Sequence, residues 1–220
     1  MKAMIMAAGR GKRLGELTLH TPKPLLKINN LSLIEYRLLA LAKAGFTEIV
    51  INVSYLGQQI QAYLGDGERY SVKISYSVES EPLEVGGGIK KALPLLGDQP
   101  FLLTNSDIYT NFPYQDLKNI ELELAHLVLV NNPPHIPGGD FSLAGRLVCE
   151  KTNKTYTYSG IAVLHPKLFT GVSKENFFLT EVLKPAIIQK KVTGQYYSGL
   201  WQDIGRPHDF FALQQQPSND

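Results

Sequence analysis

The chain has 220 residues, with 22 Lys and Arg against 20 Asp and Glu, an apolar fraction of 44% and a single cysteine, Cys149. One cysteine excludes a disulfide framework and a zinc site built from several thiolates. A net charge of +2 is too small for a protein that binds nucleic acid or membrane surfaces through a basic face. The apolar run after Lys2 is shorter than the core of a signal peptide, and no run approaches the length of a membrane span. We therefore expect a cytoplasmic protein of one domain, residues 1–220, with neither nucleic acid nor membrane among its partners.

Strand and helix patterns alternate through the first part of the chain. Short apolar runs predict strands at 3–7, 48–53, 72–77, 101–104 and 125–130. Amphipathic spacing predicts helices between them at 32–44, 58–64 and 88–96. The first helix carries a capping box formed by Ser32 and Glu35, and Gly45 ends it. Because strands and helices alternate at this spacing, the sequence predicts a core of parallel βαβ units over about 1–130.

Proline and glycine clusters mark a change of character after residue 130. The elements predicted next are mostly strands, at 141–143, 147–149 and 156–164, which indicates a β-rich lid over about 131–200. A helix at 179–190, a strand at 192–197 and the segment 201–205 are expected to return the chain to the core. The tail, 214–220, is polar and is expected to fray.

The loop after the first strand combines small residues with positive charge. Only Glu16 opposes five cations within 18 positions: Arg10, Lys12, Arg13, Lys23 and Lys27. The loop follows a parallel strand at its carboxyl end, where α/β sheets bind ligands, and small residues let backbone N–H groups approach an anion. A plain glycine-rich turn is the structural alternative, which Lys23 disfavours because Pro22 and Pro24 restrict the backbone around it. The sequence therefore predicts a polyphosphate site.

Two common phosphate loops do not fit this segment. The dinucleotide fingerprint Gly-x-Gly-x-x-Gly fails because Leu14 stands at the third glycine position after Gly9 and Gly11. No Walker string Gly-x-x-x-x-Gly-Lys-Ser/Thr is present. A nicotinamide-dependent dehydrogenase is therefore disfavoured.

Two aspartates in distant parts of the chain are candidate metal ligands. Asp107 follows the strand at 101–104, where an aspartate is also a common turn former or helix cap. Asp203 stands among apolar neighbours, where an unpaired carboxylate is costly to bury. Two carboxylates, completed by phosphate oxygens and water, suit Mg²⁺ bound with a nucleotide. The His, Cys and Ser residues form no recognisable nucleophilic triad.

The glycine run Gly86-Gly87-Gly88 is expected to open the helix at 88–96. Glycines inside a helix cost about 1 kcal/mol each, so their presence there needs an offsetting interaction. A flexible turn is one explanation, and close approach of the backbone to a nucleobase is the other.

The motifs together resemble the signature of the sugar-1-phosphate nucleotidylyltransferases. These enzymes join a nucleoside triphosphate to a sugar 1-phosphate and release pyrophosphate. The resemblance begins with Ala7-Ala8-Gly9-x-Gly11-x-Arg13 and Pro22-Lys23-Pro24-Leu25 and extends through essentially the whole chain, by way of Glu84 to Gly88, Asn105-Ser106-Asp107, Ser159-Gly160-Ile161 and Trp201 to Gly205. It is strongest to the branch of the family that uses UTP and N-acetylmuramate 1-phosphate in peptidoglycan recycling, through Leu19 to Pro24, Asn132-Pro133-x-His135, Gly139-Asp140-Phe141 and Val163 to Pro166.

This resemblance implies both a fold and a set of site residues. The fold is α/β, a Rossmann-like, mixed and mainly parallel sheet sandwiched by helices, with a small β-rich lid that binds the sugar. The catalytic residues are Arg13 and Lys23, and Asp107 and Asp203 hold Mg²⁺ (magnesium). The nucleotide-binding residues are Ala7, Ala8, Gly9, Gly11, Lys12, Arg13, Lys23, Glu84, Gly87 and Gly88. The sugar-phosphate-binding residues are Asn105, Asp140, Glu150 and Gly160.

The partners implied are an NTP, expected to be UTP, and a sugar 1-phosphate, with the chain acting as a monomer or homodimer. Base and sugar selection rest on few contacts, so a mannose-1-phosphate guanylyltransferase or another hexose-1-phosphate nucleotidylyltransferase is the alternative within the family. A non-catalytic sensor of sugar nucleotides is the alternative of another class. The presence of Arg13, Lys23, Asp107 and Asp203 argues against the sensor.

Overall fold

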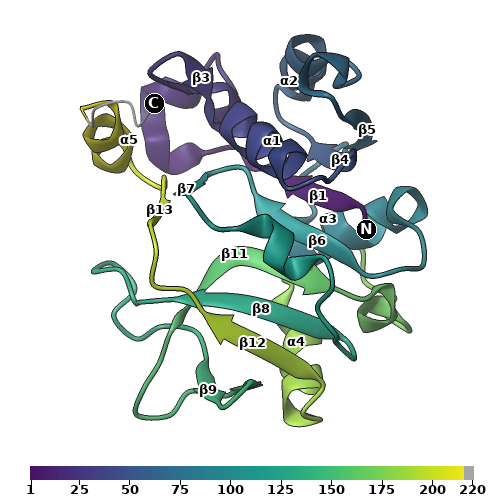
Figure 1. Ribbon diagram of the computed structural model, residues 1–220. Helices are drawn as coiled ribbons and strands as arrows, with labels where there is room; N and C mark the ends of the chain where they lie inside the picture. The colour runs from purple at the N-terminus through teal and green to yellow at the C-terminus, as the bar shows by residue number, and fades with distance from the viewer. Residues whose placement is uncertain (216–220) are drawn as a thin grey trace.

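The computed structural model describes residues 1–215. A single large sheet runs through the molecule (Figure 1). The last five residues of the predicted tail, 216–220, lie outside the described residues. The sheet has nine strands in the order β5-β4-β1-β6-β11-β8-β12-β10-β9. In that order their bounds are Lys73–Val78, Glu48–Val53, Ala3–Met6, Phe101–Asn105, Thr157–Leu164, Ala125–Val130, Val192–Tyr196, Leu147–Cys149 and Ser142–Ala144.

The sheet is mixed, with a parallel half that comes first in the chain. Strands β5, β4, β1 and β6 are parallel neighbours, whereas β11 pairs antiparallel with both β6 and β8. Beyond them β12 is parallel to β8, and β10 is antiparallel to β12 and β9. The β-rich segment predicted after residue 130 therefore adds its strands to the same sheet and does not form a separate one. The predicted mixed, mainly parallel sheet is confirmed.

Helices cover both faces of this sheet, as predicted. On one face α1 (Leu33–Lys43) and α2 (Gly57–Leu64) pack through apolar side chains such as Leu38, Leu41 and Ile60, which have no exposed surface. On the other face α3 (Glu84–Leu96) and α4 (Thr180–Ile188) pack through Ile89 and Leu183. Burying one such side chain contributes about 1.5 to 3 kcal/mol. These two apolar layers hold the strands in place on either side of the candidate site.

The N-terminal capping box of α1 forms as predicted. The Ser32 N–H donates to Glu35 Oε2 at 2.8 Å, and the Ser32 hydroxyl lies 2.8 Å from the same oxygen. The hydroxyls of Tyr63 and Tyr70 also donate to the Glu35 carboxylate. These four donors lower the pKa of Glu35 against the raising effect of burial.

The glycine run lies inside α3, because the helix begins at Glu84 and not at Gly88 as expected. A Cβ on Gly86 would stand 2.5 Å from the ring of Phe177, and one on Gly87 would stand 2.0 Å from the Glu175 carbonyl oxygen. The Gly87 N–H also donates to the Phe177 carbonyl oxygen at 3.2 Å. Close packing of the segment before α4 therefore offsets the helix cost of these glycines.

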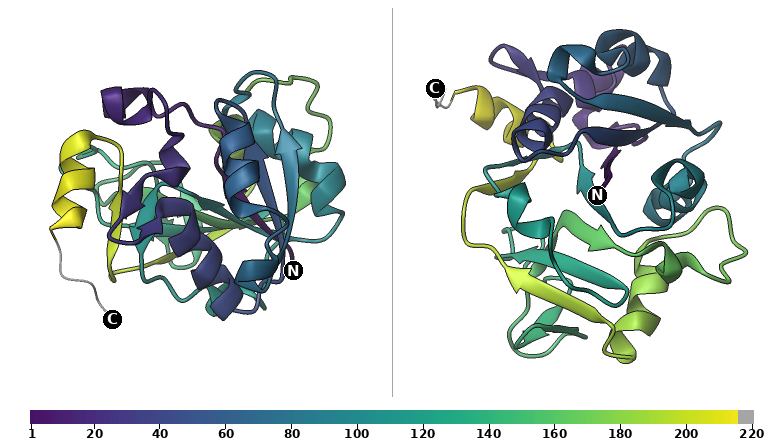
Figure 2. Two further views of the ribbon diagram at one scale, coloured as in Figure 1. Left: turned by 90° about the horizontal axis from the view of Figure 1, so that it is seen from above. Right: turned by 45° about the vertical axis from the view of Figure 1, so that its right-hand side comes forward.

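Two short ladders and a terminal helix lie outside the main sheet, and the sequence did not predict them. Strands β7 (Ile108–Thr110) and β13 (Trp201–Asp203) pair antiparallel, as do β2 (Lys27–Ile28) and β3 (Leu31–Ser32). Figure 2 shows the terminal helix α5 (Pro207–Gln214) beside η1 (Lys12–Thr18), the first turn after β1. A third apolar cluster joins them through Leu14, Ile204 and Phe210. In the part of the chain that the structure describes, no helix has the length and apolar content needed to cross a membrane.

Candidate active site

A cleft of about 480 Å³ opens where β1 and β6 end. Carboxyl ends of neighbouring parallel strands meet at one edge of a sheet, which is where open α/β sheets bind ligands. The lining consists of residues 6–13, Lys23, Pro24, Asn52, Glu79, residues 82–85, residues 105–107 and Gly205. Most of the predicted phosphate loop thus shares one cleft with Lys23, Asn105 and Asp107.

The loop after β1 presents its cations to solvent. Arg10, Lys12 and Arg13 are exposed, whereas Leu14 is buried and anchors the loop to the apolar cluster with α5. Gly11 has a φ of +66°, a conformation that favours glycine. A Cβ there would lie 3.1 Å from Lys23 Cβ, so the absence of a side chain also lets Lys23 lie against the loop. The loop therefore provides the concentrated positive charge that the sequence predicted.

Lys23 reaches across the cleft to the end of β6. It lies in the short turn η2 (Lys23–Leu25), which Pro22 caps in extended conformation, and its residue surface is 7% exposed. Its Nζ donates to Asp107 Oδ2 at 2.5 Å. The proline-restricted backbone thus directs the amine toward the carboxylate predicted to bind metal.

The backbones of the two predicted metal ligands approach one another where β7 begins and β13 ends. Asp203 pairs with Ile108, the residue after Asp107, and the Ile204 N–H donates to the Asp107 carbonyl oxygen at 2.8 Å. The His135 imidazole Nε2 lies 3.3 Å from Asp203 Oδ1. A Cβ on Gly205 would lie 3.1 Å from Asp203 Oδ2 and 3.2 Å from Arg13 Nη1, so the guanidinium and this carboxylate approach the same backbone.

These two carboxylates suit a magnesium ion that is shared with a nucleotide. Among residues 1–215, no group of three or more His, Cys, Asp or Glu side chains is arranged to hold a metal ion. Mg²⁺ typically takes one or two carboxylates and completes its shell with water and phosphate oxygens. Both Asp107 and Asp203 are partly exposed, at 33% and 24% of their side-chain surface, but only Asp107 is among the residues that line the cleft.

Of the predicted sugar-phosphate residues, Asn105 and Gly160 lie together. Asn105 ends β6, and a Cβ on Gly160 would stand 2.6 Å from its Nδ2. Gly160 has a φ of +79° and sits where the pairing of β11 with β8 shifts register. The indole N–H of Trp201 on β13 donates to the Ser159 carbonyl oxygen at 2.9 Å and holds this irregularity in place.

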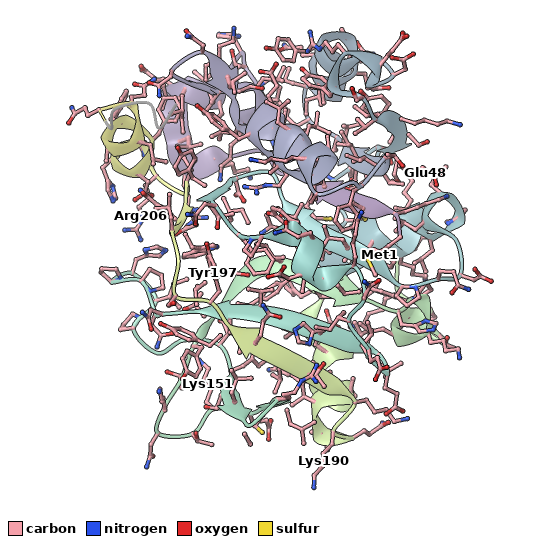
Figure 3. All side chains as sticks on the ribbon, in the orientation of Figure 1. Met1, Glu48, Lys151, Lys190, Tyr197 and Arg206 are labelled. Atoms are coloured by element: carbon pink, nitrogen blue, oxygen red, sulfur yellow. The ribbon has the colours of Figure 1, made fainter. Side chains whose placement is uncertain are left out.

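Asp140 and Glu150 are not among the residues that line the cleft. Asp140 Oδ2 accepts the Tyr158 N–H at 2.8 Å, and Glu150 is exposed and follows β10, next to the edge strand β9. Figure 3 shows Lys151, the next residue, among the lid strands, whereas Arg206, the neighbour of cleft residue Gly205, lies beside β13. Roles for Asp140 and Glu150 in binding the sugar phosphate remain predictions.

The start of α3 reaches the cleft through Glu84 and its neighbours, but Gly87 and Gly88 do not line it. Gly87 packs on the segment before α4, as described above. A Cβ on Gly88 would lie 2.7 Å from Glu79 Oε1 and 2.9 Å from Asn52 Nδ2. A role for Gly87 and Gly88 at the nucleobase remains a prediction, while their packing roles are visible.

A buried hydrogen-bond network lies under the cleft, and the sequence did not predict it. The side chain of Asn52 accepts the Ala7 N–H at 2.8 Å and donates to Glu79 Oε1 at 2.7 Å. Glu79 Oε2 accepts the Leu83 N–H at 3.1 Å. Burial raises the pKa of Glu79, and the bonds from Asn52 and Leu83 oppose that rise. The signal available in the sequence was an asparagine inside the apolar strand 48–53 and a glutamate directly after the strand 73–78.

Comparisons with known proteins identify the family. Residues 2–130 match the sequence model described as nucleotidyl transferase. The chain is 46% identical over 215 residues to the N-acetylmuramate alpha-1-phosphate uridylyltransferase of Neisseria meningitidis serogroup B, with 93% of each chain covered. It is 32% identical to the mannose-1-phosphate guanyltransferase of Aspergillus oryzae, over 96% of this chain and 63% of that one.

Solved structures confirm the fold. A putative glucose-1-phosphate thymidylyltransferase from Bacillus anthracis has a TM-score of 0.85 at 19% identity, with 100% of this chain and 98% of that chain covered. The inositol-1-phosphate CTP transferase of T. maritima has a TM-score of 0.78 at 20% identity, with 97% and 94% covered. With the family model and the 46% identical relative, the resemblance seen in the motifs is confirmed, and the chain is an enzyme that belongs to the nucleotidyl transferase family.

Proposed function

We propose that the chain transfers a uridylyl group from UTP to N-acetylmuramate 1-phosphate, releasing pyrophosphate and forming the UDP-sugar. The observation that carries this proposal is a single cleft in which the cationic loop, Lys23 and Asp107 meet at the ends of β1 and β6. The name of the relative with 46% identity supports the choice of base and sugar. By the same resemblance we extend the proposal to a cytoplasmic role in peptidoglycan recycling.

The proposed reaction is an in-line displacement. An oxygen of the sugar phosphate attacks the α-phosphorus of UTP, the bond from that phosphorus to the bridging oxygen breaks, and pyrophosphate leaves with the electron pair. The second pKa of a phosphate ester is about 6, so the nucleophile is already ionised at neutral pH and no general base is required. Catalysis then depends on positioning and on neutralising charge.

Arg13 and Lys23 are the proposed catalytic residues. Arg13 neutralises the β- and γ-phosphates that depart, and Lys23 holds the α-phosphate. The backbone of Ala7, Ala8, Gly9 and Gly11, with the side chain of Lys12, cradles the triphosphate. Support comes from the exposure of Lys12 and Arg13 and from the position of the Lys23 amine, which contacts Asp107 just after β6 ends.

Asp107 and Asp203 are the proposed ligands of Mg²⁺. The bound ion would supply positive charge against phosphate oxygens. In the protein alone, Lys23 and His135 contact these two carboxylates. The approach of their backbones where β7 begins and β13 ends, and the partial exposure of both side chains, support the assignment.

We further propose that residues 1–130 bind the nucleotide and 131–200 the sugar. At the base end we assign Glu84, with Gly87 and Gly88 behind it, and at the sugar-phosphate end Asn105 and Gly160, with Asp140 and Glu150 farther out. The support is strongest for Glu84 and Asn105, which line the cleft.

A second candidate is guanylyl transfer to mannose 1-phosphate. It is favoured by the relatives of 32% identity that carry this name. Pyrophosphate release, measured for each of the four NTPs with a panel of sugar 1-phosphates, separates the two. We expect UTP with N-acetylmuramate 1-phosphate to turn over fastest, whereas faster turnover of GTP with mannose 1-phosphate would select the second candidate.

Removing the Asp107 carboxylate tests whether the chain is an Mg²⁺-dependent enzyme or a non-catalytic sensor of sugar nucleotides. Asp107→Ala is expected to abolish Mg²⁺-dependent turnover in a protein that still folds, with a lower melting temperature because the buried Lys23 amine loses its acceptor. Asp98→Ala, at an exposed position outside the cleft, is the matched control and should turn over normally. Undiminished turnover by Asp107→Ala would remove this residue from the metal site, and no turnover by the unmodified protein with any substrate pair would favour a sensor.

A further inference from the structure

Arg37 is a buried cation to which the proposed reaction gives no role. It lies on α1, in the apolar layer between that helix and the sheet, and only 1% of its surface is exposed. Among residues 1–215 it forms no salt bridge with a carboxylate, and its Nε has no hydrogen-bond partner. Taking a guanidinium out of water without a counter-charge is costly, and an apolar side chain of similar volume is often equally stable or more so. Its presence therefore calls for a reason other than core stability.

The two guanidinium nitrogens that do have partners hold one functional segment from both sides. Nη2 donates to the carbonyl oxygen of Ile108, the first residue of β7. Nη1 donates to the Tyr114 hydroxyl, and the Tyr114 ring lies 5.4 Å from the guanidinium carbon. Because the Tyr114 oxygen accepts from Arg37, its own hydrogen is free for Thr104 Oγ1, 3.2 Å away on β6.

Thr104 and Ile108 flank the turn that carries two of the proposed site residues. Asn105 and Asp107 lie between them, with Ser106, whose N–H donates to the Met6 carbonyl oxygen at 3.1 Å. Thr104 Oγ1 is also 3.5 Å from the Asn105 carbonyl oxygen. One buried guanidinium thus connects, directly or through Tyr114, to both ends of a three-residue turn.

We propose that Arg37 is a positioning residue for this site. Its planar fork fixes the ends of the turn 105–107, and so sets where Asn105 and Asp107 stand relative to Lys23 and to Asp203 on the paired strand. A lysine at this position would keep the charge but could not serve two partners in the fixed geometry of a guanidinium. The functional part of this inference rests on the proposed roles of Asn105 and Asp107, whereas the clamp on the turn stands on the contacts alone.

Three variants and one control test the inference. Arg37→Met removes charge and donors at similar volume, Arg37→Lys keeps only the charge, and Tyr114→Phe removes a single oxygen from the connection to β6. The control is Arg69→Met, because Arg69 also lies over tyrosine rings, those of Tyr63 and Tyr70, but is far more exposed and lies outside the cleft.

The first measurement is amide hydrogen exchange of the protein without nucleotide or metal. In Arg37→Met and Tyr114→Phe the amides of residues 105–110 should exchange faster, while those of β1 and β4 keep their protection. The second measurement is the Mg²⁺ concentration that gives half-maximal turnover. Residues that orient metal ligands typically change metal affinity or activity 10- to 100-fold, so Arg37→Met should require about tenfold more Mg²⁺ and Arg37→Lys an intermediate amount.

Unchanged exchange at 105–110 together with an unchanged Mg²⁺ requirement in Arg37→Met would overturn the inference. Full recovery in Arg37→Lys would also overturn it, because charge alone would then suffice. If Arg37→Met fails to fold, Tyr114→Phe decides by the same two measurements. If the unmodified protein shows no turnover, the proposed function fails, and the exchange data still judge the clamp.

Discussion

Replacing Asn52 with alanine tests whether the buried network under the cleft is held together as its distances indicate. The residue is 1% exposed and lies on β4, and its side chain contacts the loop after β1 through the Ala7 N–H and the loop after β5 through Glu79. Asn52→Ala leaves the Ala7 N–H and Glu79 Oε1 without these partners. Glu79 itself is 3% exposed, so water does not readily replace the lost donor.

The expected cost follows from these two losses. A buried donor left unpaired costs about 1 to 3 kcal/mol, and a hydrogen bond to a charged group contributes about 1.5 to 3 kcal/mol. We therefore expect Asn52→Ala to lower the free energy of unfolding by about 3 kcal/mol or more at neutral pH. This is a large share of the stability of a typical domain.

The cost should also depend on pH, with a definite sign. Burial raises the pKa of Glu79, and Asn52 opposes that rise, so the variant raises this pKa further. A carboxyl whose pKa is higher in the folded state than in the unfolded state favours folding as the pH falls toward 4.5. The penalty of Asn52→Ala should therefore shrink at low pH, by about 1.4 kcal/mol for each unit by which the pKa rises.

Urea unfolding at pH 8 and at pH 5.5 measures both effects. The midpoint should fall with little change in the slope, and the loss should be smaller at pH 5.5. In a Glu79→Gln background the same substitution should lose its pH dependence, and Asn176→Ala, an exposed control, should change stability by less than about 0.5 kcal/mol. A loss below about 0.5 kcal/mol for Asn52→Ala, or an equal loss at both pH values, would refute the reasoning.

Three further predictions concern single side chains. Lys23→Met should reduce kcat about 100-fold or more while the circular dichroism spectrum stays unchanged, because removing one hydrogen-bond donor to a transition state typically lowers kcat by this factor. Steady-state pyrophosphate release measures kcat, and an undiminished kcat would contradict a catalytic role for Lys23. Gly160→Ala should lower the free energy of unfolding by more than about 1 kcal/mol because φ is positive at this residue. It should also raise the KM for the sugar phosphate, because the new methyl group would lie 2.6 Å from Asn105 Nδ2. Urea unfolding checks the first expectation and steady-state kinetics the second, and an unchanged KM would contradict a sugar-phosphate contact by Asn105. His126 is buried between Thr193 Oγ1 and Gln195 Oε1, and burial lowers its pKa. The unfolded state then binds the proton more readily, so stability should fall as the pH drops below about 6.5. Between pH 7.5 and 5.5 the melting temperature of the unmodified protein should fall more steeply than that of His126→Asn. An equal fall in the two proteins would contradict this expectation.

The sequence predicted best those elements whose formation depends on local residues. The runs at 48–53 and 125–130 are continuous and apolar, and they form strands with the predicted bounds. The predicted start of α3 at Gly88 was wrong because the low helix propensity of glycine is a local property of the sequence. The packing that offsets this propensity comes from Phe177 and Glu175, more than eighty residues away in the chain. The β7–β13 ladder escaped prediction because it depends on the pairing of short segments over a similar distance.

The candidate site divides in the same way. The loop 7–13, Lys23 and Asp107 were expected together because carboxyl ends of parallel strands converge, and the cleft contains them all. Asn52 and Glu79 were missed because a buried polar pair is recognisable only when the register of β4 and β5 is known. The motif around Asp140 predicts a contact with the sugar phosphate, whereas in the structure its carboxylate accepts the Tyr158 N–H, a contact between residues 18 positions apart in the chain.

The ladder that pairs β7 with β13 has a consequence for the order in which the molecule becomes functional. Asp107 is synthesised before Asp203, and the segment that matches the family model, 2–130, contains only the first of these proposed ligands. The cationic loop, Lys23 and the first carboxylate are therefore all synthesised before the strand that carries the second one. The second carboxylate arrives with β13, after the sheet from β5 to β12 has been made. The proposed pair of acidic ligands is therefore complete only after β13 has been synthesised.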